Sequence, residues 1–320
     1  MRPGCRRWWR GSVRRGSEAL ALALLAAPAV ADLAYVTCQS GEEVSVIDLA
    51  TLSEVARWPL PGKPAGVAVV AGAVYTVAAE TKTVRRHAPS GALMAEAVLD
   101  GGPIGIAVDA VRGRVFVSDW YEARVRVLDA ATLMPLADLA TAAAPAGLDL
   151  SPDGRFLAAA ERDADRVSVF DAATLAPLWQ APVGIRPFGL RFAPDGRLFV
   201  ANVGSDDVTV LDTGTGAALA TIKVGARPYG VGFAGGRAFV TNQYAETISV
   251  IALNTLAVVA TLDVGEYPEG VDSTRDGLIA VANWFSNTLS VIDAETLETI
   301  AEIETCDGPR AFGAFVAPAQ

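Results

Sequence analysis

The sequence predicts an all-β protein, a single seven-bladed β-propeller of four-stranded blades. One observation is a D-x-x-T turn, which occurs in full at 48–51, 129–132, 171–174, 212–215 and 293–296, with degenerate copies at 88–91 and 252–255. From residue 132 onward its threonines recur every 40 to 42 residues. The other observation is that each interval holds four short apolar runs. A period of this length with four strands is typical of a propeller blade.

The first strand of each unit is built from small residues and begins with glycine. It reads GVAV at 66–69, GIAV at 105–108, GLDL at 147–150, GLRF at 189–192, GVGF at 230–233 and GVDS at 270–273. We expect these inner strands to line the central axis, because glycine suits places where backbones approach closely.

The remaining strands of a unit follow in a fixed order. A tight turn, twice Pro-Asp-Gly at 152–154 and 194–196, leads to a buried second strand such as 237–242. A third strand such as 247–251 alternates with period two. The D-x-x-T turn caps it, since Asp and Thr side chains bond nearby backbone amides. An outer strand such as 258–262 ends the unit.

The two ends of the repeat region are predicted to form the last blade together. Residues 34–59 supply second, third and outer strands without an inner strand, and residues 311–316 supply an inner strand with nothing after it. Their pairing completes the seventh blade, so the seam keeps no unpaired edge.

Two cysteines fall at this seam. Cys38 ends the second strand of the closing blade, and Cys306 lies just before its inner strand, which places both at the same face. We expect a disulfide that joins the two ends of the ring in an oxidising compartment. Two unrelated thiols, or a redox pair, are the alternatives.

The first 31 residues have the composition of a cleavable signal peptide. Six arginines form a basic head, 19–27 is apolar, and Ala29-Val30-Ala31 predicts cleavage before Asp32. About ten apolar residues are too few to cross ~30 Å of hydrocarbon. Gly16-Ser17-Glu18 is not the apolar continuation that the twin-arginine route prefers, so the general secretory route is favoured. The propeller domain is then 32–320, and its location periplasmic or secreted.

The net charge of the chain argues against nucleic acid as a partner. Cleavage would remove six arginines and Glu18, which takes the formal net charge from −10 to −15. An acidic protein gains nothing from neutralising phosphates, so nucleic acid is a disfavoured partner. No further apolar run approaches 18 residues, so we expect no membrane span after processing. We expect a monomer.

Several phrases resemble the YVTN repeat of the bacterial YncE-like propellers. They include Tyr-Val-Thr-Cys at 35–38, Phe-Val-Thr-Asn at 239–242 and Leu-Ser-Val-Ile-Asp at 289–293, and the resemblance covers about residues 33–317. It implies the seven-bladed fold but leaves the function open. The same blades resemble those of seven-bladed lactonases, amine dehydrogenase heavy chains and propellers found alongside quinoprotein dehydrogenases. The chain departs from the pattern at Cys38, where Asn is usual, and at 83–91, which lacks the D-x-x-T turn.

Catalytic groups are scarce, and we predict no catalytic residue, metal or cofactor. His87 is the single histidine, at a third-strand position where other units carry large apolar residues, so we expect it to be packed. One histidine rules out a poly-His copper or zinc site and argues against a Ser-His-Asp triad. No C-x-x-C-H stretch for covalent haem exists. Glu161, Asp163 and Asp165 are expected to form a solvated acidic loop rather than a Ca²⁺ site.

A candidate site lies on the face where inner strands begin and second strands end, around the axial funnel. Aromatic and arginine side chains gather there, and such residues dominate binding hot spots. The alternative is that several of them pack over the blades and seal the core, and that Glu269 and Arg310 form an ion pair. The predicted ligand- or partner-binding residues are Lys63, Trp120, Tyr121, Arg186, Phe188, Arg227, Tyr229, Tyr244, Tyr267, Glu269, Trp284, Phe285 and Arg310.

These observations favour an exported, non-catalytic binding or scaffold protein that holds an unknown protein or small molecule at the axial face. One alternative is a lactonase-like hydrolase, with a bound cation or an ordered Glu/Arg cluster in the funnel. The other, from family analogy alone, is an accessory of a periplasmic quinoprotein dehydrogenase.

Overall fold

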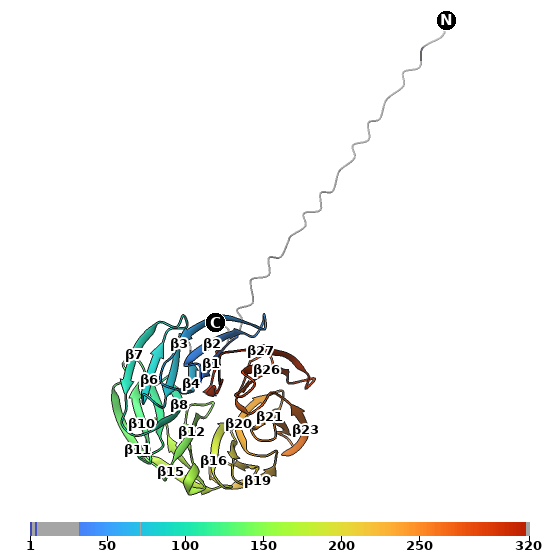
Figure 1. Ribbon diagram of the computed structural model, residues 1–320. Helices are drawn as coiled ribbons and strands as arrows, with labels where there is room; N and C mark the ends of the chain where they lie inside the picture. The colour runs from blue at the N-terminus through green and yellow to red at the C-terminus, as the bar shows by residue number, and fades with distance from the viewer. Residues whose placement is uncertain (2–3, 5–31, 71, 318–320) are drawn as a thin grey trace. The chain divides into compact units, whose positions relative to one another are not determined.

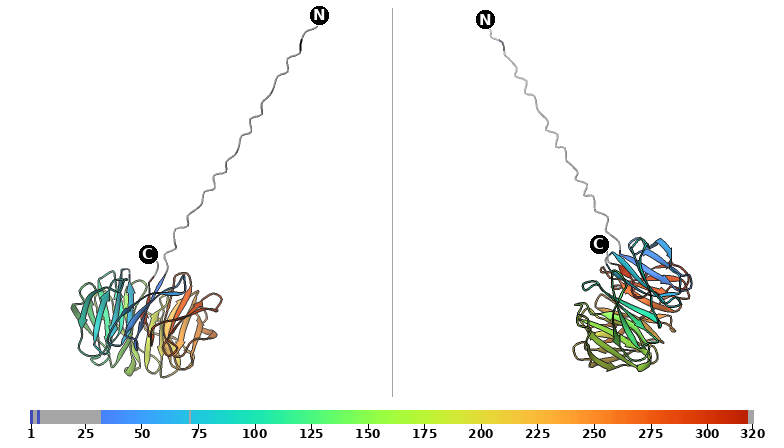
Figure 2. Two further views of the ribbon diagram at one scale, coloured as in Figure 1. Left: turned by 45° about the horizontal axis from the view of Figure 1, so that its top comes forward. Right: turned by 90° about the vertical axis from the view of Figure 1, so that its left-hand side faces the viewer.

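The computed structural model describes residues 1, 4, 32–70 and 72–317. The predicted signal peptide at 1–31 falls outside these residues except at positions 1 and 4. Within the described part, the strands form seven sheets arranged in a ring (Figure 1), which confirms the predicted seven-bladed propeller. Figure 2 shows the sheets standing next to one another around the ring. The helical content there is one 3-10 turn, η1 (Arg162–Ala164).

Six blades are continuous in sequence, and each runs from the axis outward. Their inner strands are β4 (Pro64–Val70), β8 (Pro103–Asp109), β12 (Pro145–Leu150), β16 (Pro187–Phe192), β20 (Pro228–Ala234) and β24 (Pro268–Ser273). The second strands are β5 (Ala73–Ala78), β9 (Arg114–Asp119), β13 (Phe156–Glu161), β17 (Leu198–Asn202), β21 (Arg237–Asn242) and β25 (Leu278–Asn283). The third strands are β6 (Thr83–His87), β10 (Arg124–Asp129), β14 (Arg166–Asp171), β18 (Asp207–Leu211), β22 (Thr247–Ala252) and β26 (Thr288–Asp293). The outer strands are β7 (Leu93–Val98), β11 (Pro135–Ala140), β15 (Pro177–Pro182), β19 (Ala218–Lys223), β23 (Ala257–Asp263) and β27 (Thr299–Glu304).

The seventh blade is assembled from both ends of the described chain. It contains β1 (Leu33–Cys38), β2 (Glu43–Asp48), β3 (Ser53–Pro59) and β29 (Val316–Ala317), in the order β29-β1-β2-β3. In Figure 1 the blue strands β1, β2 and β3 lie beside the red strands β26 and β27. The predicted closure of the ring is therefore confirmed.

The predicted inner strand over 311–316 is interrupted. Arg310 N donates to Thr37 O at 2.8 Å, so the segment before the break already lies along β1. Between Arg310 and β29, the chain leaves β1, and β28 (Phe312–Ala314) pairs in parallel with β4 of the next blade. Gly313, with φ of 133°, lies at this break in a conformation that glycine adopts readily.

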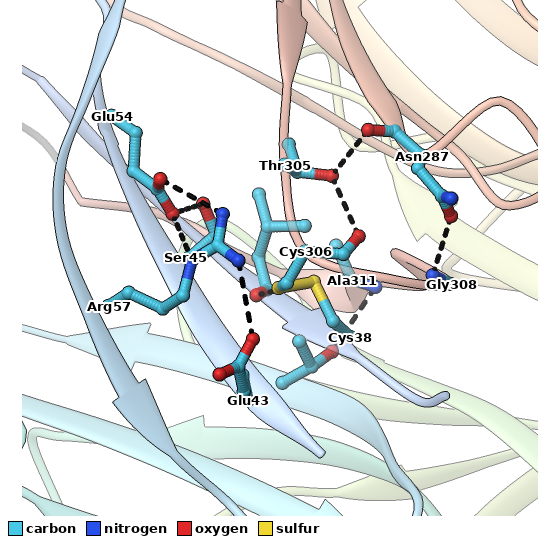
Figure 3. The surroundings of a disulfide bond; sticks show 12 residues. Cys38, Glu43, Ser45, Glu54, Arg57, Asn287, Thr305, Cys306, Gly308 and Ala311 are labelled. Carbon is cyan, nitrogen blue, oxygen red and sulfur yellow. Dashed lines mark hydrogen bonds and ion pairs between the residues drawn. A yellow bond between two sulfur atoms is a disulfide. The ribbon is translucent and has the colours of Figure 1, made fainter. Parts of the chain in front are cut away.

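The seam disulfide predicted from the sequence is present. Cys38 and Cys306 are bonded, with their Cα atoms 5.7 Å apart, and both are buried. Hydrogen bonds hold the segment around Cys306 in place (Figure 3). Thr305 Oγ1 donates to Asn287 O at 3.0 Å, and Gly308 N donates to Asn287 Oδ1 at 2.8 Å.

Glycine is required on the inner strands because neighbouring backbones nearly touch. A Cβ on Gly189 would lie 2.0 Å from the carbonyl oxygen of Tyr229, and one on Gly105 would lie 2.2 Å from that of Ala146. Real Cβ atoms do not approach so closely, so any larger residue would push two blades apart. The sequence-based interpretation of these glycines is confirmed.

The hydrophobic core is divided among the interfaces between blades. Second-strand phenylalanines reach the next blade, as Phe116 packs with Leu148 and Leu157, and Phe239 packs with Val271. Burying one such ring contributes roughly 2–3 kcal/mol. Each interface therefore stabilises two neighbours at once, which explains why the repeat needs a closed ring.

Polar side chains tie the second strand of a blade to its third. Asn242 Nδ2 donates to Thr247 Oγ1 at 3.1 Å and to Ser249 Oγ at 2.9 Å, which explains the Asn of the YVTN phrase. Asn283 makes the same pair of bonds in the next blade. In the closing blade the disulfide of Cys38 takes this place.

Two blades use charged residues at the same position. Asp119 lies 3.4 Å from Arg124 and 3.2 Å from Arg126, and Glu161 bonds Arg166 and Ser168. Glu161 is fully buried, so the expectation that it belongs to a solvated loop is wrong. A carboxylate fits at this position because its partners on the third strand are arginine side chains or a serine hydroxyl.

His87 is buried, as expected, and its ring lies 6.4 Å from that of Trp58. Burial, together with the nearby Arg85, lowers the pKa of His87.

No helix in the described residues is long and apolar enough to span a membrane.

Candidate functional site

The loops that enter the inner strands share one backbone conformation. The residue before the strand's proline is left-handed, with φ of 58° at Lys63, 54° at Arg186, 55° at Arg227 and 60° at Tyr267. Such values are uncommon outside glycine. Here the carbonyl of the left-handed residue accepts a bond from the residue after the second strand, as Trp284 N donates to Tyr267 O at 3.0 Å. The recurring bond brings side chains from two loops of each blade to one face.

Aromatic side chains close the axis at this face. Phe188 lies 4.4 Å from Tyr229, 5.1 Å from Phe312 and 6.0 Å from Trp120 between ring centroids. Phe188 and Tyr229 are only 8% and 5% exposed. We call Trp120, Phe188, Tyr229 and Phe312 the axial plug. It fills the mouth of the axial funnel.

A buried ion pair lies against the plug. Arg310 Nε donates to Glu269 Oε2 at 2.5 Å, and its Nη2 donates to the Tyr229 hydroxyl at 2.7 Å. Gln243 Nε2 donates to Glu269 Oε1 at 2.6 Å, and Gln39 Oε1 accepts from Arg310 at 3.2 Å. Burial raises the pKa of Glu269, while Arg310 counteracts the rise. Every polar contact here is internal, so the pair orders the plug.

Four further aromatic residues form a second group toward the rim of this face. Tyr267 lies 5.4 Å from Tyr244, 5.5 Å from Trp284 and 4.6 Å from Phe285, and the last two rings stack at 5.3 Å. Tyr244 is 56% exposed and Phe285 is 60% exposed. We call these four residues the rim cluster. They come from two adjacent blades, and Tyr244 and Phe285 present their rings to solvent.

Two arginines lie over these rings. The guanidinium of Arg227 is 4.3 Å from the ring centroid of Tyr244, and its Nη1 donates to the Tyr244 hydroxyl at 2.7 Å. Arg310 lies 4.7 Å from the centroid of Trp284 and thereby connects the rim cluster with the axial plug. Cation–π contacts of this kind hold the rings in a fixed arrangement.

The other predicted residues lie apart from both groups. Tyr121 is 76% exposed and has no ring partner among the described residues. Lys63 Nζ lies 3.3 Å from Glu42. Arg186 is exposed, and its backbone N–H donates to Asp165 Oδ1 at 2.8 Å.

Only some of the aromatic residues predicted for this face are exposed. Phe188 and Tyr229 are buried because the side chain after the entry proline points toward the axis, where large rings meet. Phe312 was missed, since its strand is irregular, and so were Gln39 and Gln243. Their only sequence signal is position beside the entry loops.

Glu269 is the fully buried carboxylate of the candidate site. Its two oxygens accept hydrogen bonds from Gln243 and Arg310. Within the described residues, no group of three or more His, Cys, Asp and Glu side chains is arranged to hold a metal ion.

Two family models match parts of the chain. Residues 198–316 match a YNCE-like beta-propeller, and residues 108–223 match a lactonase with a 7-bladed beta-propeller. The matches support the YncE-like propeller family predicted from the repeat phrases. No curated protein matches the chain.

Solved structures with the same fold include enzymes and a protein of unknown function. Dihydro-heme d1 dehydrogenase NirN in complex with DHE is 18% identical, with a TM-score of 0.68 over 90% of this chain and 75% of that one. Hydrazine synthase from Kuenenia stuttgartiensis is 17% identical, with a TM-score of 0.72 over 88% and 100%. A functionally unknown protein from Desulfotomaculum acetoxidans DSM 771 is 14% identical, with a TM-score of 0.75 over 89% and 98%. At these identities the likeness shows the fold alone.

Proposed function

We propose that this YncE-like β-propeller is an exported binding protein that holds a protein partner on its rim cluster and performs no catalysis itself. The observation that carries the proposal is the exposure of Tyr244 and Phe285 beside Tyr267 and Trp284. Large aromatic side chains are enriched in the energetically dominant parts of protein interfaces.

The rings are ordered before any partner arrives. Arg227 and Arg310 lie over Tyr244 and Trp284, so little side-chain freedom remains to be lost on binding. Arg227 also brings a cationic group to the edge of the cluster. We therefore expect the partner to present apolar side chains with an acidic or carbonyl group beside them.

The closed axis favours binding over hydrolysis. A lactonase-like reaction requires substrate to reach the funnel, whereas the nearly buried rings of Phe188 and Tyr229 lie at its mouth, 4.4 Å apart between centroids. The lactonase match at 108–223 includes neither Glu269 nor Arg310. The ordered Glu/Arg pair expected of a hydrolase is present, but its hydrogen bonds are already satisfied internally.

Export is part of the proposal. The buried Cys38–Cys306 disulfide fits an oxidising compartment such as the periplasm. The signal peptide at 1–31 is proposed from its sequence, and its cleavage would be seen as an N-terminus at Asp32 in mass spectrometry of the mature protein.

A capture experiment tests the proposal and identifies the partner. Dehydrogenase and hydrazine synthase structures share the fold. If the captured partner is a periplasmic quinoprotein dehydrogenase, the protein is an accessory of that enzyme. The wild-type protein, a Tyr244→Ala/Phe285→Ala variant and a Tyr121→Ala control would each be used to capture partners from native periplasmic extract. Tyr121 is a matched control, since it is exposed at the same face but outside the cluster.

We expect one protein to be retained by the wild type and the control and lost with the double variant, by about tenfold or more. Equal retention by all three baits would contradict the proposal. Retention of a small molecule that is converted to product would favour the hydrolase instead.

A further inference from the structure

A second site lies inside the ring, on the other side of the axial plug. The axis there holds a cavity of about 210 Å³, lined by residues of all six continuous inner strands and of β28. Phe312 of the plug closes one end. The cavity is separate from the rim cluster, so a ligand bound in it is independent of the proposed function.

One position of each inner strand is equivalent in the repeat, and in four of the six strands its residue lines this cavity. It is the fourth residue after the entry proline, and half of the inner strands have a small residue there. The occupants in chain order are Ala68, Ala107, Asp149, Arg191, Gly232 and Asp272. Of these residues, Asp149 and Arg191 bring charge to the cavity wall, and Asp272 is bonded to Arg191.

Arg191 and Asp272 neutralise each other. Arg191 Nη2 donates to Asp272 Oδ1 at 2.7 Å, although β20 lies between their strands in chain order. The second oxygen of Asp272 accepts from the backbone N–H of Val316 at 2.9 Å. This carboxylate is therefore satisfied within the protein.

Asp149 is not neutralised. Its Oδ2 accepts a bond from the backbone N–H of Phe192 at 2.8 Å, and no cationic side chain lies within ion-pair distance of it among the described residues. Burial raises the pKa of Asp149 to about 6, with Arg191 acting against the rise and Asp272 adding to it. A carboxylate in such surroundings binds a proton or a cation more readily than one in water.

Apart from Asp149, Arg191 and Glu269, the residues that line the cavity are small or apolar, and Glu269 is already paired with Arg310. Val69, Val108, Leu148 and Val231 are among the residues that line it. The volume corresponds to about seven water molecules at liquid density, which suits a small compact molecule. The Arg191–Asp272 and Arg310–Glu269 pairs are each neutral, so an ionised Asp149 leaves the surroundings of the cavity with an excess of one negative charge.

We infer that the axial cavity binds a small aliphatic amine in its ammonium form, with the ammonium group on Asp149 and the hydrocarbon part against the valine and leucine side chains. An inorganic cation fits less well, because Ca²⁺ requires six to eight oxygen ligands and the cavity offers one free carboxylate among apolar walls. An anion would have to displace Asp272 from Arg191.

The test measures binding of n-butylammonium, butanoate and CaCl₂ by calorimetry at pH 7.5 with the full-length mature protein. The variants are Asp149→Asn, Val108→Phe, which fills the cavity without changing its charge, and an Asp263→Asn control. Asp263 is an exposed carboxylate on the outer strand β23. Thermal unfolding confirms that each variant is folded.

We expect n-butylammonium to bind and the other two probes not to bind. Asp149→Asn should weaken binding about ten- to a hundredfold, since a charge-assisted bond is lost, and the control should leave it unchanged. Val108→Phe should abolish it, which keeps the inference testable if Asp149→Asn does not fold. Between pH 6 and pH 5 the affinity should fall by up to about tenfold as Asp149 becomes protonated.

The inference is overturned if n-butylammonium does not bind, if butanoate or Ca²⁺ binds in its place, or if neither Asp149→Asn nor Val108→Phe weakens binding.

Discussion

Replacing both seam cysteines with alanine should strongly destabilise the ring. The disulfide joins positions separated by 268 residues, so it encloses nearly the whole propeller. In the chain-entropy treatment a loop of this length stabilises the folded state by about 5–6 kcal/mol. Measured values seldom exceed about 5 kcal/mol, so we expect a loss of about 4 kcal/mol in the free energy of unfolding.

Urea unfolding of wild type and of the Cys38→Ala/Cys306→Ala variant, with and without a reducing agent, measures this loss. With an m-value of about 3 kcal/mol/M, the midpoint should fall by about 1–1.5 M. Reductant should lower the wild-type midpoint to that of the variant and leave the variant unchanged. A shift below about 0.3 M, or about 1 kcal/mol at that m-value, would refute the reasoning. It would mean that the hydrogen bonds between β1 and the chain end hold the seam without the disulfide.

Two further predictions concern buried charges. Arg310→Ala should cost about 3–5 kcal/mol in unfolding free energy at pH 7, since it leaves the fully buried Glu269 without its cation, whereas Arg310→Met/Glu269→Leu should recover most of that loss. Equal stabilities of the two variants would contradict this. The second concerns Asp149, whose pKa is raised to about 6, so the folded state binds more protons than the unfolded state between about pH 4 and 6. Its ionisation therefore costs stability above pH 6, and the cost disappears as the pH falls toward 4. Asp149→Asn should stabilise the protein by about 1–3 kcal/mol at pH 7.5 and progressively less on acidification, measured as the difference between wild-type and variant urea curves. A difference independent of pH would exclude this cause.

The fold was predictable from the sequence because its determinants are local and repeated. Gly189 and its equivalents mark the inner strands, since only glycine fits beside the next backbone. The D-x-x-T turns mark the ends of third strands, where Asp129 Oδ1 accepts bonds from the backbone of Ala131 and Thr132. Cys38 and Cys306 locate the seam.

The candidate site was only partly predictable. Phe188 and Phe285 can both be assigned to one end of the ring from the repeat, but the direction of each ring cannot. Exposure depends on that direction, which places Phe188 over the axis and Phe285 in solvent. The charged residues of the cavity wall were missed for a related reason. The repeat places Asp149 and Arg191 on inner strands near the axis, but which inner-strand side chains border a cavity depends on the closed ring.

The inner-strand position four residues after the entry proline bears on how such proteins diverge. Asp149 and Arg191 line the cavity and belong to none of the hydrophobic clusters between blades, so a change at either position alters the cavity while those clusters keep their residues. Arg191 illustrates this, because its guanidinium reaches Asp272, two blades further along the chain, without being part of a hydrophobic cluster. Ligand preference can therefore evolve one blade at a time, independently of the surface that the same protein presents to a partner.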